Sequence, residues 1–206
     1  EPVGGASGVV VAPDNYFPRV ENLLTKYDIM MWSDEVICGF GRTGSNFGCE
    51  SMGFTPKLIS LAKQLSSAYL PISASVIPEY MHEAMIEPSS KVGVFGHGYT
   101  YTGHPAACAA ALKTLEIYQR DNLFGHAADM GEYLQDKLSE FKNHPLVGEV
   151  RGRGLIGAVE LVANKETGEA FGDLAVGAHA KQACQDNGLL VRAVGGNSIE
   201  IGRAHV

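Results

Sequence analysis

The chain has 206 residues, 45% of them hydrophobic, which is enough to bury the core of one large or two small domains. Its 16 Lys and Arg residues against 23 Asp and Glu residues give a net charge of -7 without a basic block, which argues against nucleic acid or an anionic membrane as the partner. No apolar run approaches the roughly 20 residues of a membrane span and no leader opens the chain, so we expect a soluble, cytoplasmic protein with a small-molecule site.

Short apolar runs alternate with helical patterns over the first half of the chain. The expected elements are a strand at 9–11, a helix behind Pro18, strands at 29–32, 58–62 and 72–77, and a helix at 78–87. Strand, helix and strand in this order are typical of βαβ units, so we predict an α/β fold with a mostly parallel sheet. The segment from Cys38 to Pro56 is rich in Gly, Ser and Asn and predicts a long functional loop.

The second half has an α+β pattern of its own. It predicts helices at 106–119, 122–141 and 174–185, and strands at 147–151, 155–162 and 188–192. Thr102 is the expected N-cap of the first of these helices. The change of pattern places a domain boundary between residues 122 and 123, giving domains at 1–122 and 123–206.

Two charged residues follow apolar runs directly. Asp34 comes after the run at 29–32, and Lys63 comes after the run at 58–62. Open α/β sheets bind their ligands at the carboxyl ends of the strands, so this placement indicates a shared site. The alternative is that both are solvated charges at the rim of the sheet.

Two Gly-rich segments match the dinucleotide-binding pattern G-x-G-x-x-G literally. They lie at Gly39–Gly44 and Gly152–Gly157. A dinucleotide fingerprint opens a helix and is followed by an acidic residue about 20 positions later. Neither segment has this context, which weakens but leaves open a nicotinamide-dependent oxidoreductase.

The possible metal ligands form no binding pattern. The four cysteines contain no C-x-x-C pair, and the seven histidines form neither H-x-x-x-H nor H-E-x-x-H. We therefore predict no metal site and four free thiols.

Three segments carry a resemblance to a known family. The segments Asp34–Gly44, Leu61–Ala74 and His97–Pro105 together resemble the class III pyridoxal-phosphate aminotransferases in order and spacing, with Asp34 and Lys63 29 positions apart. The resemblance implies the type I fold of pyridoxal-phosphate enzymes. Residues 1–122 then correspond to the C-terminal part of the cofactor-binding large domain, and residues 123–206 to an incomplete small domain.

The resemblance also implies a site. Lys63 forms the Schiff base with pyridoxal 5'-phosphate and moves the substrate proton, and Asp34 pairs with the pyridine nitrogen. Val36 packs on the ring face and Thr100 contacts the phosphate. In this family that threonine reaches the cofactor of the neighbouring subunit, so a homodimer is implied.

The expected reaction is transfer of an amino group from an amine or ω-amino acid to a keto acid such as pyruvate. Arg192 matches the arginine that binds the acceptor's carboxylate in related ω-transaminases. Some branches pair this arginine with a glutamate at the position of Ala6, and alanine there favours the pyruvate-dependent branch. A same-fold aminomutase, a decarboxylating enzyme and a non-catalytic binding module are the alternatives.

The chain departs from the family's pattern at both ends. The family's first half, with most of the phosphate cup, is absent, so we expect these 206 residues alone to be inactive and poorly stable. The last residues, from Glu200 to Val206, resemble translated sequencing-adapter DNA and indicate a truncated read.

Overall fold

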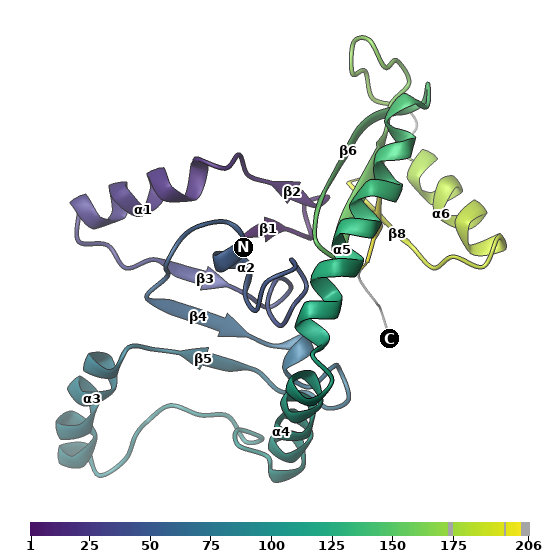
Figure 1. The fold of residues 1–206 in the computed structure, drawn as a ribbon. Helices are drawn as coiled ribbons and strands as arrows, with labels where there is room; N and C mark the ends of the chain where they lie inside the picture. Colours follow the sequence, from purple (N-terminus) through teal and green to yellow (C-terminus); the bar gives the residue numbers. More distant parts are fainter. Residues whose placement is uncertain (173–174, 196, 203–206) are drawn as a thin grey trace.

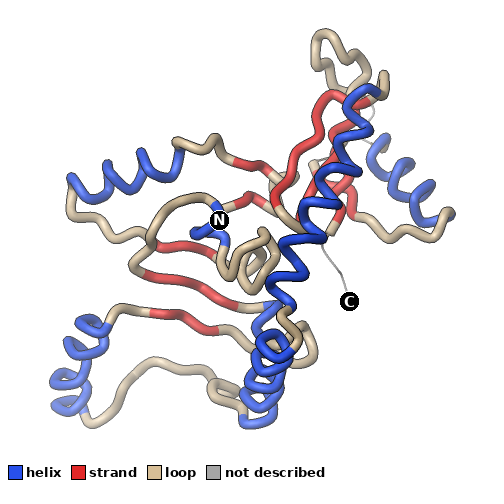
Figure 2. The backbone as a smooth tube through the Cα atoms, viewed as in Figure 1, coloured by secondary structure: helices blue, strands red, loops and turns tan. Residues whose placement is uncertain are grey.

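The computed structural model describes residues 1–172, 175–195 and 197–202. These residues form a two-stranded, a three-stranded and a four-stranded sheet with helices around them (Figure 1). Figure 2 shows that long loops join several of these elements, including the one that returns from α3 (Glu79–Val92) to α4 (Pro105–Arg120). None of the helices in the described ranges has the length and apolarity to cross a membrane.

The three-stranded sheet holds the only parallel strand pair among the described residues. Strand β3 (Trp32–Asp34) pairs in parallel with β4 (Leu58–Leu61), and β4 pairs antiparallel with β5 (Ala74–Val76). The expected α/β character is confirmed, but the prediction of a mostly parallel sheet is wrong for this part of the fold. The chain turns back after β4 through a loop instead of crossing over through a helix, and this makes β5 antiparallel.

The first strand of the predicted βαβ unit lies elsewhere. Strand β2 (Val10–Val11) pairs antiparallel with β1 (Val3–Gly4), and helix α1 (Tyr16–Lys26) then leads to β3. The helix therefore connects two different sheets. It buries none of its residues, and neither does α3.

Helix α4 begins within one residue of its predicted start, but the expected N-cap is wrong. Its N-cap is His104, and Pro105 takes the first helical position, where proline's fixed φ suits the helix and its missing N–H is no loss. Thr102 is not the cap: its Oγ1 accepts a hydrogen bond from the Tyr99 backbone N–H at 2.7 Å and so closes a turn before the helix.

The C-terminal part is an antiparallel sheet with two helices. The elements are α5 (Leu123–Ser139), the 3-10 helix η2 (Glu140–Asn143), β6 (Val147–Arg153), β7 (Ile156–Leu161), α6 (Val176–Asp186), β8 (Arg192–Val194) and β9 (Ser198–Ile201). The strand order is β6-β7-β9-β8. Strand β8 starts where the predicted strand was to end, because α6 is followed by a left-handed Gly188 and then by chain that pairs only from Arg192. The start of the predicted helix at 174 lies outside the described residues.

The two parts of the chain share a core. One buried cluster combines Val3, Val9, Ile37 and Cys38 with Ile156 and Ala158 of β7. Helix α5 runs from α4 to the side of β6 in Figure 1. The boundary between residues 122 and 123 stays a prediction, and apolar packing crosses it.

Candidate active site

Asp34 and Lys63 leave the same edge of the parallel strand pair. Asp34 is the last residue of β3, and its register partner in β4 is Ser60. Strand β4 ends at Leu61, and Lys63 opens the short 3-10 helix η1 (Lys63–Leu65). Both residues are solvent-exposed, although buried residues lie close to each of them in the sequence. This is the carboxyl edge at which α/β folds bind ligands.

The turn that carries Lys63 has a strained backbone. Lys63 has a φ of 47°, and Ser67 and Ala68 have φ values of 50° and 61°, so three non-glycine residues adopt the left-handed conformation. Leu65 and Ser66 are buried beneath the turn, and Ser66 Oγ donates to the Leu70 carbonyl at 2.7 Å. Strain of this kind persists only where the surroundings enforce it, and it clusters at functional sites.

Asp34 is held by its own loop. Its Oδ1 accepts a hydrogen bond from the backbone N–H of Val36 at 3.0 Å, which closes an Asx turn. The turn fixes the direction of the carboxylate and leaves its other oxygen available. Val36 is half-buried beside it.

Glu35 is a part of this region that the sequence interpretation missed. Its side chain is fully buried, and its carboxylate accepts hydrogen bonds from Ser33 Oγ and from the backbone N–H groups of Gly48 and Cys49. A signal for it exists in the sequence. Alternate residues of an extended chain share a face, and at the end of β3 Ser33 and Glu35 are buried whereas Asp34 between them is exposed.

Two cysteines near Glu35 have thiols of low reactivity. Burial is the main reason that the pKa of Cys38 and that of Cys49 rise to about 12, and the negative charge of Glu35 adds to both shifts. The thiolate is the reactive form of cysteine, so neither side chain is suited to be a nucleophile at neutral pH.

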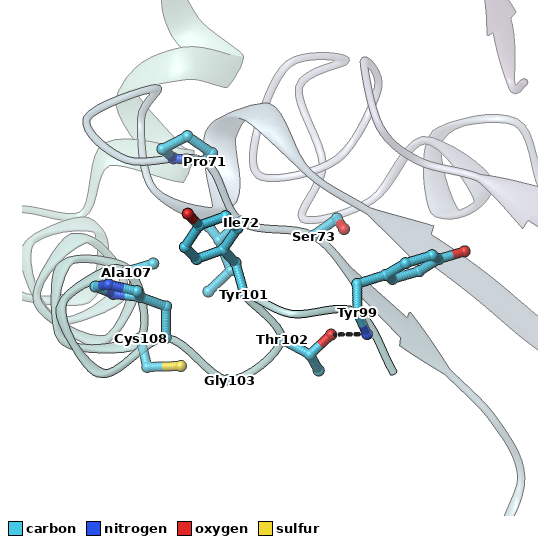
Figure 3. Close-up of a pocket in the computed structure, with 10 residues that line it drawn as sticks. Pro71, Ile72, Ser73, Tyr99, Tyr101, Thr102, Gly103, Ala107 and Cys108 are labelled. Carbon is cyan, nitrogen blue, oxygen red and sulfur yellow. Dashed lines mark hydrogen bonds between the residues drawn. The ribbon is translucent and has the colours of Figure 1, made fainter. Parts of the chain in front are cut away.

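The loop before α4 forms the wall of a pocket of about 490 Å³ (Figure 3). The pocket is lined by Pro71, Ile72, Ser73, Tyr99, Tyr101, Thr102, Gly103, His104, Ala107 and Cys108. Thr100 belongs to this loop but does not line the pocket, and its side chain is exposed. Asp34 and Lys63 do not line this pocket either.

Arg192 belongs to β8 of the four-stranded sheet, and not to the sheet that contains the parallel pair. It is the register partner of Glu200, and its Nη1 lies 3.6 Å from Glu200 Oε2. The Arg192 side chain keeps 33% of its surface exposed, whereas that of Glu200 is fully buried. Glu200 is the first residue of the segment 200–206, of which residues 203–206 lie outside the described residues.

Ala6 lies exposed in the turn between β1 and β2. The turn is tied to the same four-stranded sheet, because Arg151 of β6 donates from Nε to the Gly8 carbonyl at 2.8 Å. Ala6 and Arg192 thus both lie on segments attached to that sheet.

Neither Gly-rich match has the context of a dinucleotide fingerprint. Residues Gly39–Gly44 form successive turns, and Gly152–Gly157 spans the β6–β7 hairpin. The parallel strand pair instead places an amine and a carboxylate at its carboxyl edge, where α/β folds bind small-molecule ligands.

Comparison with known proteins identifies the family. The chain matches the aminotransferase class-III family over residues 1–206, and it belongs to that family. It is 44% identical over 200 residues to a putrescine–pyruvate aminotransferase of Pseudomonas aeruginosa, covering 97% of this chain and 43% of that protein. It is 43% identical over 198 residues to gamma aminobutyrate transaminase 3 of Solanum lycopersicum, covering 96% of this chain and 38% of the relative.

Solved structures agree with this membership. A transaminase with L-alanine superposes with a TM-score of 0.93 at 46% identity, covering 97% of this chain and 47% of that one. The omega transaminase of Pseudomonas jessenii in complex with PMP gives a TM-score of 0.93 at 43% identity, covering 98% and 44%. The fold is therefore that of the class III transaminases. The chain spans less than half the length of the relatives that it matches.

Proposed function

We propose that the full-length protein containing these residues is a pyridoxal 5'-phosphate-dependent transaminase. It moves an amino group from an amine or ω-amino acid to a keto acid such as pyruvate. The observation that carries the proposal is the shared strand edge from which Asp34 and Lys63 emerge. The similarity to a putrescine–pyruvate aminotransferase supports the choice of amine and acceptor.

The side chains at this edge fit the cofactor chemically. An exposed lysine amine is the group that condenses with an aldehyde, and a carboxylate is the usual partner of the cofactor's pyridinium nitrogen. Val36 offers an apolar, half-buried surface beside Asp34 for the ring face. Thr100 offers a hydroxyl for a phosphate oxygen.

The cofactor, when bound, supplies an electron sink for the charge that develops on the substrate carbon. Lys63 Nζ would hold the cofactor through its aldehyde group, and the same amine would move the proton lost from the donor carbon. Asp34, oriented by the Val36 N–H, would hold the ring nitrogen and favour its protonated form. Arg192 pairs in bidentate fashion with the carboxylate of the keto acid.

The homodimer is part of the same proposal. Thr100 is flanked by Tyr99 and Tyr101, whose side chains are 84% and 81% exposed in this chain. Large exposed aromatic side chains in one loop are typical of a surface that a partner covers. We propose that a second subunit covers this loop and that Thr100 serves the cofactor of that subunit.

The test is to incubate the full-length protein with pyridoxal phosphate, an amine such as putrescine, and pyruvate. The proposal predicts that alanine forms in step with loss of the amine. Isomerisation of a substrate without any acceptor would favour the aminomutase, and release of CO2 would favour the decarboxylating enzyme. Consumption of the amine only when a nicotinamide cofactor is added would favour the oxidoreductase.

A further inference from the structure

Glu35 has a fully buried carboxylate that accepts hydrogen bonds from residues at both ends of the loop between β3 and α2. Its Oε2 accepts from the Gly48 N–H at 2.7 Å, and its Oε1 accepts from the Cys49 N–H at 2.8 Å. Ser33 Oγ donates to Oε1 at 3.0 Å. The carboxylate thus ties the first turn of α2 (Gly48–Ser51) to the end of β3.

The backbone of Glu35 is fixed as firmly as its side chain. Its N–H donates to the Ser60 carbonyl at 3.0 Å, and its carbonyl accepts from the Gly39 N–H at 2.9 Å. Gly39 packs so closely that a Cβ there would lie 2.9 Å from the Glu35 carbonyl oxygen. These contacts restrict the backbone conformation of Glu35.

Asp34 immediately precedes Glu35 in the sequence. The Asx turn that orients the Asp34 carboxylate uses the N–H of Val36, the residue that follows Glu35. Because a strand sends alternate side chains to opposite faces, a rotation of Glu35 would turn Asp34 as well. The three donors to Glu35 are uncharged groups of the protein itself. They satisfy the carboxylate internally and give it no contact with a ligand.

We infer that Glu35 is a positioning residue for the reaction. Its buried carboxylate locks the backbone around Asp34, so that the Asp34 carboxylate stays directed at the cofactor's ring nitrogen. This role rests on the proposed function for the identity of the ligand, whereas the locking of the backbone does not depend on it.

The sharpest variant is Glu35→Gln in the full-length protein, because it keeps the shape of the side chain. Glutamine has a single acceptor oxygen, so its NH2 group must face either the Gly48 or the Cys49 N–H, donor against donor. Glu50→Gln is the matched control. Glu50 is exposed and caps the same short helix by accepting from the Phe47 N–H at 3.3 Å, with no bond to β3. Ser33→Ala removes one donor and is a milder second variant.

The first readout needs no cofactor. Hydrogen exchange of the peptide spanning residues 33–39 in the cofactor-free protein is expected to quicken about tenfold in Glu35→Gln, since one misplaced polar contact typically shifts local stability by that amount. Ser33→Ala should move exchange in the same direction by less, and Glu50→Gln should leave it unchanged. Unchanged exchange in Glu35→Gln, or an equal change in Glu50→Gln, overturns the inference.

The second readout is the dissociation constant of pyridoxal phosphate in a double-mutant cycle with Asp34→Asn. Positioning predicts that Glu35→Gln weakens binding about tenfold when Asp34 is present and has little effect in the Asp34→Asn background. Additive losses would show a general structural effect and overturn the inference. If the unmutated protein binds no pyridoxal phosphate, the proposed function fails, and the exchange experiment still decides whether Glu35 locks the loop.

Discussion

Asp34 lies opposite Ser60 in the parallel pairing of β3 and β4, and Lys63 follows Ser60 after only two intervening residues. The pairing brings the ends of two distant segments to one sheet edge. A carboxylate and an amine that are 29 positions apart in the sequence thereby come to the same edge.

The role of Asp34 is tested by Asp34→Asn in the full-length protein. We expect pyridoxal phosphate to stay attached at Lys63, while kcat/KM for the amine falls by about 10²-fold or more, because the ring nitrogen loses its charged partner. Asp28→Asn, a change at an exposed aspartate in the turn before β3, is the control and should leave the rate unchanged. A rate in Asp34→Asn within a few-fold of the unmutated protein would contradict the assignment.

Arg192 is tested by separating the two substrates. Arg192→Lys should raise the KM for pyruvate about tenfold or more, because lysine cannot make the bidentate pair with a carboxylate. The KM for an amine donor without a carboxylate should not change. Equal effects on both substrates would show that Arg192 supports the sheet and does not select the acceptor.

Gly154 joins the two parts of the chain through a close contact. A Cβ on Gly154 would lie 2.4 Å from the Thr43 carbonyl carbon, and Gly154 has a φ of 58°. We expect Gly154→Ala to lower the free energy of unfolding by about 3 kcal/mol, through backbone overlap added to the left-handed conformation. Denaturant unfolding of the full-length protein measures it.

Gly53→Ala separates these two causes. Gly53 also has a positive φ, 72°, but a Cβ there would meet nothing within 4 Å. Its substitution should therefore show only the conformational cost, about 1 kcal/mol. A loss in Gly154→Ala no larger than this would mean that the close contact is easily relieved.

The buried thiols predict a loss of stability at high pH. Burial raises the pKa of Cys38 from 9.0 to about 12, so the folded state keeps the proton that the unfolded state loses above pH 9. The stabilisation is fully present below pH 9 and disappears as the pH rises through 12. Through this thiol, raising the pH from 8 to 10 should lower the free energy of unfolding by on the order of 1 kcal/mol.

Comparing variants isolates this thiol from the other groups that titrate at high pH. Cys38→Ala should lose less stability than the unmutated protein between pH 8 and pH 10. Cys184→Ala, at a half-buried cysteine, is the control and should lose as much as the unmutated protein. Parallel pH dependence in all three proteins would contradict the prediction.

Much of the fold follows from local patterns. The long periodic segments that became α4, α5, β6 and β7 were predicted to within a few residues, because each has an apolar side that only one secondary structure can bury. The direction of β5 could not be predicted in this way. It depends on how the loop after Lys63 turns, and three left-handed residues in that loop are not glycines.

Only part of the candidate site could be predicted from local patterns in the sequence. Asp34 and Lys63 are visible because each follows an apolar run. Glu35 was missed, because its partners Gly48 and Cys49 come from a segment that the sequence presents only as a polar loop. Thr100 belongs to the loop before α4 and Arg192 to β8 of another sheet, and their roles depend on the family resemblance.

The most direct test of the central claim is borohydride reduction of the full-length protein with pyridoxal phosphate bound, followed by peptide mapping. Reduction fixes a Schiff base as a stable amine, so the mass of the cofactor marks the lysine that held it. The proposed function predicts one labelled peptide, carrying the mark on Lys63, and no label in Lys63→Arg. A label on another lysine, or none in a protein that is folded and saturated with pyridoxal phosphate, would contradict it.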